Sequence, residues 1–171
     1  SNASDAIQRR QYLGLTNPHL LNASDNRIVL RCDGKKKILE IQDTGIGLNE
    51  VELSETLGTL AKSGTESFLK QLEKTKDDKV AASNLIGKFG VGFYSSFIVA
   101  KKVIVETRRA GLDSSEGGRW TCEGEADYQI EPVEKDDRGT TVTMFLKSDE
   151  TEFANDWRLR SIVKKYSDLI S

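Results

Sequence analysis

The chain has 171 residues, the size of one domain that buries roughly 70% of its extended surface. Its 37% hydrophobic and 30% charged residues are typical of a globular protein, and 25 basic against 27 acidic side chains leave a net charge of −2. No basic stripe outweighs its acidic neighbours and no apolar run is long enough to span a bilayer, which argues against nucleic-acid and membrane proteins.

The two cysteines and the single histidine give no sign of a metal site. Cys32 and Cys122 are far apart and lack a C-x-x-C partner, which favours reduced thiols in a cytoplasmic protein over a disulfide framework or a zinc site. His19 follows Asn17-Pro18 in a polar loop, where we expect a solvated side chain. Residues 1–3 are polar; they include no secretory signal and also fit a tag remnant.

Residues 1–15 predict an amphipathic helix, because apolar groups recur at helical spacing. These groups are Ala3, Ala6, Ile7, the stem of Arg10 and Leu13. Gly14 and Asn17-Pro18 are expected to end this helix, and its abrupt start suggests that it begins upstream of residue 1. Two strands are expected next, over residues 27–32 and 38–43, joined by a turn at Asp33-Gly34.

A second helix is predicted where Asn49 precedes Glu52 by three residues, the spacing of a capping box. We expect it to reach Leu57 and to end at Gly58. Residues 63–66 repeat the capping pattern ahead of a short helix through residue 72. Residues 73–83 are charged and without apolar periodicity, which predicts a mobile connection and, with its neighbours over about 58–87, a lid.

The second half of the chain predicts a short buried helix over 93–100 and then four strands separated by short turns. The strands are expected over 103–107, 119–122, 128–131 and 140–146, as an antiparallel meander. An acidic segment, 148–156, leads into a last helix over 158–170. This order predicts an α+β fold, a two-layer sandwich with helices on one face of a mostly antiparallel mixed sheet.

The glycine-rich stretch 87–93 carries the first functional signal, with three glycines in six residues directly before an apolar helical segment. Glycines let successive N–H groups point into one concavity, and the helix start adds further donors, so the pattern predicts a phosphate cradle. It is neither a Walker loop nor a Rossmann fingerprint, since neither spacing is present. A glycine turn that only closes a loop fits the motif equally well.

Asp43 is the candidate for reading the base. It ends an expected strand before Thr44-Gly45-Ile46-Gly47, where the glycines allow close approach. A buried carboxylate accepts from the exocyclic amine of adenine and repels the carbonyl oxygen of guanine, so one such group selects the base. On its own, the motif also fits an ordinary Asp-initiated turn.

Asn2 and Asp5 are candidates for a magnesium site, because they present oxygens one turn apart on nearly the same helix face. Polar residues at a helix end are the alternative interpretation.

Five motifs, in order, carry a family resemblance: SNASDA, DTGIG, LGTLAKSGT, GKFGVGFYS and RGTTVTMFLK. Together they closely resemble the N-terminal nucleotide-binding domain of the heat shock protein 90 chaperones, and the final WRLRSIVKKYSDLI is most similar to the bacterial branch of that family. The resemblance covers essentially residues 1–171 as a single ATP-binding domain. It implies the Bergerat, or GHKL, ATPase fold, whose other members are not expected to carry LGTLAKSGT.

The resemblance also implies roles for individual residues. Asn2 matches the magnesium ligand, Asp5 its neighbour near the sugar-phosphate, and Asp43 the adenine-reading carboxylate, supported by Thr140 through an ordered water. Gly47 and Leu48 match residues that line the base pocket, and Phe93 matches its wall. Lys62 and Ser63 match the lid hinge. The phosphate-binding loop is matched by Gly87, Gly90, Val91, Gly92 and Phe93. Thr56 stands where many eukaryotic members have an Asn near the nucleotide, and Lys88 stands where Gln is usual in the glycine loop. Both departures weaken the case for carrying these two contacts over to this chain.

In the family the general base lies just upstream of the magnesium-binding Asn, here before residue 1. The parent is therefore expected to hydrolyse ATP to ADP as a stress-response chaperone, while residues 1–171 mainly bind adenine nucleotide and Mg²⁺. Client binding and homodimer formation are expected to involve regions outside this sequence. Two alternatives remain: a non-hydrolysing, nucleotide-sensing interaction module, and the ATP domain of a histidine kinase, for which His19 is a poor phosphoacceptor.

Overall fold

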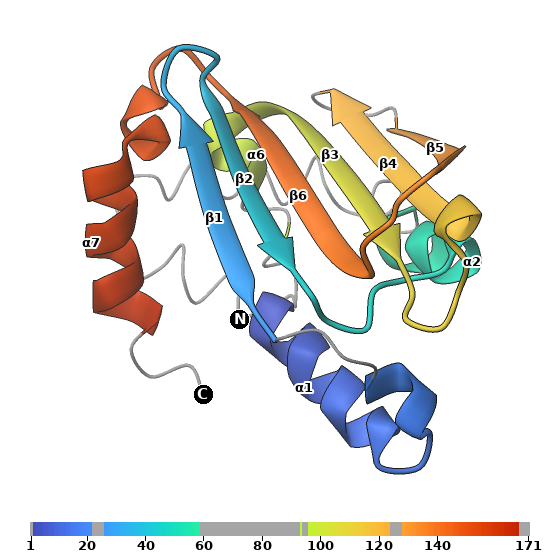
Figure 1. Ribbon diagram of the computed structural model, residues 1–171. Helices are drawn as coiled ribbons and strands as arrows, with labels where there is room; N and C mark the ends of the chain where they lie inside the picture. The colour runs from blue at the N-terminus through green and yellow to red at the C-terminus, as the bar shows by residue number, and fades with distance from the viewer. Residues whose placement is uncertain (1, 22–25, 59–92, 94–95, 124–127, 168–171) are drawn as a thin grey trace.

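The structure is a computed structural model that describes residues 2–21, 26–58, 93, 96–123 and 128–167 (Figure 1). The predicted lid and most of the glycine-rich stretch lie outside these residues. The same holds for several predicted site residues, namely Lys62, Ser63, Gly87, Gly90, Val91 and Gly92.

A six-stranded sheet forms one layer of the fold. Its strands are β1 (Ile28–Asp33), β2 (Ile38–Asp43), β3 (Ala100–Arg108), β4 (Gly117–Glu123), β5 (Tyr128–Val133) and β6 (Gly139–Leu146). The order across the sheet is β1-β2-β6-β3-β4-β5, and all pairings among these strands are antiparallel rather than mixed. Only β3, β4 and β5 form the expected meander, because β6 pairs between β2 and β3.

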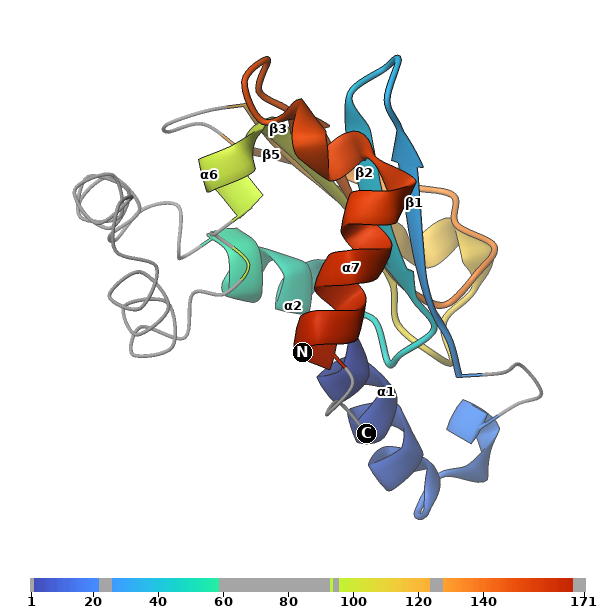
Figure 2. The ribbon, with the colours of Figure 1, turned by 90° about the vertical axis from the view of Figure 1, so that its left-hand side faces the viewer.

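Four α-helices lie among the described residues: α1 (Asn2–Gly14), α2 (Glu50–Leu53), α6 (Ser96–Val99) and α7 (Asp156–Ser167). Figure 2 shows α2 and α6 on one side of the sheet, with α7 along the same side. This arrangement confirms the two-layer α+β prediction.

Several element ends differ from the sequence prediction. The helix expected over 93–100 is shorter, because Ala100 already pairs with Leu146 as the first residue of β3. The helix after Asn49 does end at Gly58 as predicted, but from Ser54 onward it is a π-helix, Ser54–Gly58. The last helix begins two residues early, where the side chain of Asn155 accepts a hydrogen bond from the Arg158 N–H at 3.2 Å.

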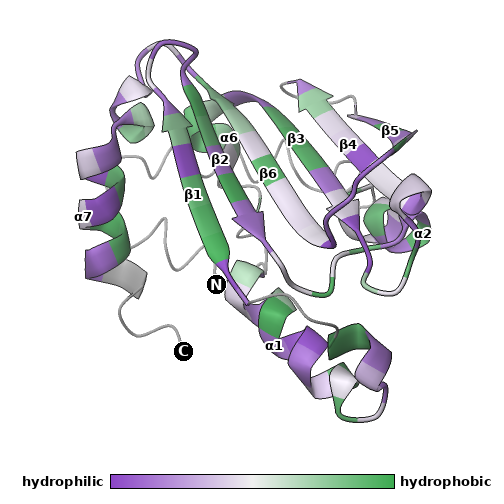
Figure 3. Cartoon of the chain, in the orientation of Figure 1, coloured by the Kyte–Doolittle hydropathy of each residue, from purple (hydrophilic) through white to green (hydrophobic). Residues whose placement is uncertain are grey.

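The hydrophobic core lies between the helices and one face of the sheet. On β3 the inward residues are Val103 and Val105, which are 0% and 2% exposed. Trp120 on β4 is fully buried, and its ring contacts Phe93, Phe97 and Tyr128. In Figure 3 the more apolar side of α7 lies toward the sheet, and Leu159 on this helix is 8% exposed.

The opposite face of the sheet carries several ion pairs. Arg31 pairs with Glu40 at 2.6 Å, and Lys102 pairs with Glu123 at 2.5 Å. Arg119 contacts both Glu106 and Glu131, at 2.6 and 2.9 Å. These charges neutralise one another, which is consistent with a solvated face.

The expected hairpin turn at Asp33 and the exposed His19 are confirmed. The β1–β2 hairpin turns at Asp33, whose side chain accepts hydrogen bonds from the N–H groups of Lys35 and Lys36 at 2.9 Å. His19 is exposed, although it lies in a short 3-10 helix, Pro18–Leu21, rather than in an open loop. Both cysteines are free. Among the helices that the structure describes, none has the length and apolar character needed to cross a membrane.

Candidate functional site

Three polar side chains form a row on the helix-covered face of the sheet. Asp43, the last residue of β2, pairs with Thr140 on β6, and Thr140 pairs in turn with Thr107 on β3. Residues paired across neighbouring strands project to the same face, so the three side chains lie side by side. Two residues further into each strand, the equivalent row is apolar: Ile41, Val142 and Val105. The polar row therefore marks the point where the core ends and a site begins.

The carboxylate of Asp43 is held in a largely dry environment. The residue is 7% exposed, and its Oδ1 accepts a hydrogen bond from the Gly45 N–H at 2.9 Å. Burial raises the pKa of the Asp43 carboxyl, while the N–H groups of Gly45 and Thr140 and the charge of Lys135 act in the opposite direction. A buried carboxylate of this kind gains from a ligand that donates a hydrogen bond to it.

The loop after Asp43 is fixed from two sides. The Ile46 N–H donates to the carbonyl of Ala6 on α1 at 3.0 Å, and the Ile46 carbonyl accepts from the Ala110 N–H at 2.7 Å. Gly47 has a φ of 66°, and a Cβ at this position would overlap the backbone of Arg108. Only glycine allows the loop to lie this close to the end of β3, which explains the glycine in the Asp-Thr-Gly-Ile-Gly motif.

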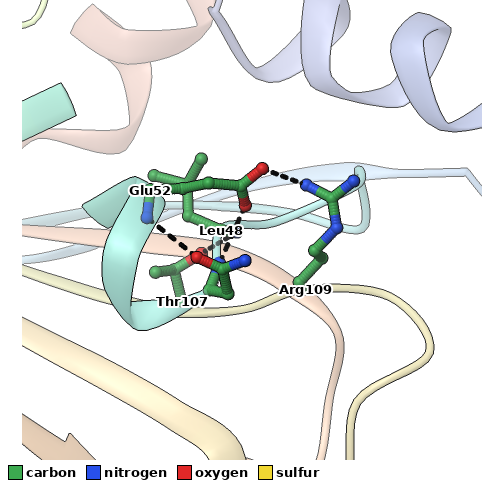
Figure 4. A network of polar contacts seen from close by, with 5 residues as sticks. Leu48, Glu52, Thr107 and Arg109 are labelled. Atoms are coloured by element: carbon green, nitrogen blue, oxygen red, sulfur yellow. Dashed lines mark hydrogen bonds and ion pairs between the residues drawn. The ribbon is translucent and has the colours of Figure 1, made fainter. Parts of the chain in front are cut away.

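A network of polar contacts joins this loop to α2 and β3 (Figure 4). Asn49 caps α2 by accepting from the Glu52 N–H at 2.8 Å, and Glu52 Oε2 accepts from the Asn49 N–H at 3.0 Å, so the predicted capping box is present. The other carboxylate oxygen of Glu52 pairs with Arg109. Burial opposes ionisation of Glu52, but the Asn49 N–H and Arg109 outweigh it and lower the pKa of the carboxyl.

The remaining predicted site residues among those described come from several parts of the chain. Asn2 and Asp5 are exposed in the first turn of α1, directly before Ala6, which contacts Gly45. Leu48 and Phe93 are partly buried and pack against the core. Thr56, the departure from the family pattern, is exposed in the π-helical segment.

The structure adds Thr107 and Arg109, which the sequence prediction did not include. Thr107 is fully buried, and its Oγ1 lies 2.9 Å from both the Leu48 N and Thr140 Oγ1. The sequence could have indicated Thr107, because it is a polar residue that follows Val103 and Val105 at the inward-facing positions of an alternating strand. Arg109 has no comparable local signal, because its partner Glu52 lies 57 residues earlier.

The hydrogen-bonding groups and oxygen ligands of this site fit an adenine nucleotide. Asp43 supplies a buried acceptor and Thr140 a hydroxyl beside it, which match an amine next to a ring nitrogen. Asn2 and Asp5 offer the amide and carboxylate oxygens that Mg²⁺ prefers, with room for its waters because both side chains are exposed. No group of three or more His, Cys, Asp or Glu that could hold a metal ion occurs in the described part of the chain.

Comparison with known proteins gives a consistent result. Residues 21–150 match the family described as histidine kinase-, DNA gyrase B-, and HSP90-like ATPase. The chain is 52% identical over 171 residues to the chaperone protein HtpG of Wolinella succinogenes, covering 99% of the chain. It is 51% and 49% identical over 172 residues to HtpG of Psychromonas ingrahamii and of Pectobacterium atrosepticum, each covering 100% of the chain. The chain spans 27% of the length of each of these relatives.

Proposed function

Since the chain belongs to the histidine kinase-, DNA gyrase B- and HSP90-like ATPase family, we propose that it is the ATP-binding domain of a heat shock protein 90-type chaperone. In this proposal the parent protein hydrolyses ATP to ADP and assists protein folding under stress. Similarity to HtpG chaperones along the whole chain supports this assignment over a histidine kinase. We further propose that it acts in the cytoplasm, as its two free thiols suggest.

The observation that carries the proposal is the buried carboxylate of Asp43 beside the hydroxyl of Thr140. In the bound state, Asp43 accepts a hydrogen bond from the exocyclic amine of adenine. Gly47 and Leu48 line the base pocket together with Phe93. The anchors of residues 44–49 on α1 and β3 hold these groups in place before the nucleotide arrives, so little order has to be gained on binding.

The remaining contacts are proposed from the family resemblance. Asn2 provides an oxygen to Mg²⁺, and Asp5 lies near the sugar-phosphate. The phosphates bind to the glycine-rich loop through Gly87, Gly90, Val91 and Gly92, with Lys62 and Ser63 approaching from the lid hinge. The ion, when bound, neutralises phosphate charge, while the chain's own residues orient the nucleotide.

A thermal-shift titration tests nucleotide binding and base choice. ADP with Mg²⁺ at 100 times its dissociation constant should stabilise the domain by about 2.7 kcal/mol, whereas GDP at the same concentration should have a much smaller effect. Asp43→Asn should remove the response to ADP and leave a folded domain. Asp149→Asn, at an exposed position, is the matched control and should retain it. A full ADP response in Asp43→Asn would show that Asp43 does not read the base.

Hydrolysis is proposed for the parent and not for residues 1–171 alone. In the family, the water-orienting Glu precedes the magnesium-binding Asn, and a middle domain contributes charge at the terminal phosphate. Positioning of the water and stabilisation of the developing charge are separate contributions to rate. Steady-state phosphate release by residues 1–171 should therefore be far slower than by the parent protein. Equal rates would contradict this part of the proposal.

A further inference from the structure

We propose that Thr107 is a specificity-determining residue, which acts by fixing the direction of the hydrogen bond that Thr140 offers to the base. This inference rests on the proposed function. Thr107 lies on β3, behind Thr140 in the polar row, and is 0% exposed. Full burial keeps it from touching the nucleotide, so it is a positioning residue that acts through its neighbour.

The neighbours of the Thr107 hydroxyl decide where its single proton goes. The Leu48 N–H can only donate, so at 2.9 Å it occupies one acceptor site of Thr107 Oγ1. The proton of Thr107 then has two possible acceptors, Thr140 Oγ1 at 2.9 Å and the carbonyl of Gly139 at 3.3 Å. The shorter contact lies in the usual range for a hydroxyl hydrogen bond and the longer one lies outside it. On this comparison of distances we assign Thr107 as the donor and Thr140 as the acceptor.

The proton of Thr140 is consequently left for a ligand. A hydroxyl that accepts from Thr107 cannot donate back to it, and the described residues provide no other partner for Thr140 Oγ1. Asp43, its cross-strand neighbour, is an acceptor. The end of the sheet thus presents an acceptor and a donor side by side, in a fixed order.

This order matches one purine edge and not the other. Adenine carries an amine donor beside a ring-nitrogen acceptor, so its amine faces Asp43 while the Thr140 hydroxyl donates to the ring nitrogen, directly or through one water. Guanine carries a carbonyl acceptor beside an N–H donor, the reverse arrangement. Without the hydroxyl of Thr107, Thr140 can rotate to accept instead of donate, and the selection against guanine weakens.

The first test compares the affinities of variants of the full chain for ADP and GDP by calorimetry with Mg²⁺ present. Thr107→Val keeps the branched shape and loses the hydroxyl, so the preference for ADP over GDP should fall about tenfold, the effect of one buried hydrogen bond. Thr107→Ser should restore the preference to within about twofold. Thr143→Val, on the open face of β6, is the matched control and should bind as the wild type does.

A second measurement needs no variant, and so holds even if Thr107→Val fails to fold. The 1-deaza analogue of ADP has a C–H in place of the ring nitrogen and should bind the wild type about tenfold more weakly than ADP. Equal binding of the two ligands by the wild type would overturn the inference. An equal loss of affinity for ADP and GDP in Thr107→Val would also overturn it, since that result describes a purely structural role.

These outcomes are separable from the proposed function. If the wild type binds no adenine nucleotide, the proposed function fails. If it binds ADP and Thr107→Val keeps the wild-type preference for ADP over GDP, only the role of Thr107 fails.

Discussion

Asp43 makes the domain's stability depend on pH in a defined direction. Its pKa is raised by burial, so the stabilisation associated with its neutral form is fully present below the ordinary value of 3.8 and is lost as pH rises through the folded-state pKa. The stability of Asp43→Asn relative to the wild type without nucleotide should therefore increase as pH rises above 3.8. Urea unfolding at a series of pH values measures this difference, and a difference independent of pH would contradict the prediction.

In the proposed site the same carboxyl accepts more strongly from the amine of adenine when it is ionised, because a charged acceptor forms the stronger hydrogen bond. The affinity for ADP should consequently decrease as pH falls through the raised pKa of Asp43, and the affinity of Asp43→Asn should lack this dependence. The ionised carboxylate of Asp43 thus serves the proposed base recognition and lowers the stability of the folded domain. Such a loss of stability is typical of residues that are retained for binding.

At the scale of elements, the short helix α2 is joined to the end of β3 by the ion pair between Glu52 and Arg109, the residue directly after that strand. The two side chains are 28% and 26% exposed. Glu52→Gln keeps a side-chain acceptor for the cap and removes the charge, so at pH 7 it should cost about 0.5–1 kcal/mol. The pKa of Glu52 is lowered, so its contribution is present above the ordinary carboxyl pKa and is lost as pH falls through the folded-state value.

A double-mutant cycle with Arg109→Met isolates this pair by chemical denaturation. The two substitutions should be less than additive at pH 7 and additive at low pH, where Glu52 is protonated. Additive effects at neutral pH would show that the ion pair does not couple α2 to β3.

Elements specified by neighbouring residues could be predicted from the sequence, and those specified by distant pairing could not. The β1–β2 hairpin and the capping box at Asn49 follow from residues within a few positions of one another. The helix expected over 93–100 loses its last residue to β3 because Ala100 pairs with Leu146 of β6, a residue 46 positions later in the chain. The glycines next to Asp43 suffice to predict it as a site residue, whereas the role proposed for Thr107 depends on the register of three strands.

For the whole molecule, the two faces of the sheet should respond differently to substitution. Val105 and Ile104 are adjacent on β3 and project to opposite faces; Val105 is 2% exposed in the core, and Ile104 lies on the open face. Val105→Ala should cost about 2 kcal/mol by leaving a cavity. Ile104→Ala removes more atoms but should cost less than about 1 kcal/mol, because the site is at the surface. Equal losses in chemical denaturation would mean that the open face is covered in solution.

The position of β6 between β2 and β3 has a consequence for synthesis on the ribosome. Residues 139–146 form β6, the last of the described strands to emerge. This strand lies in the interior of the sheet and carries Thr140. Until they arrive, β2 and β3 have no partner to connect them, and Asp43 and Thr107 remain apart. A nascent chain that stops before residue 139 therefore lacks the proposed adenine pocket, whatever helices and hairpins it has already formed.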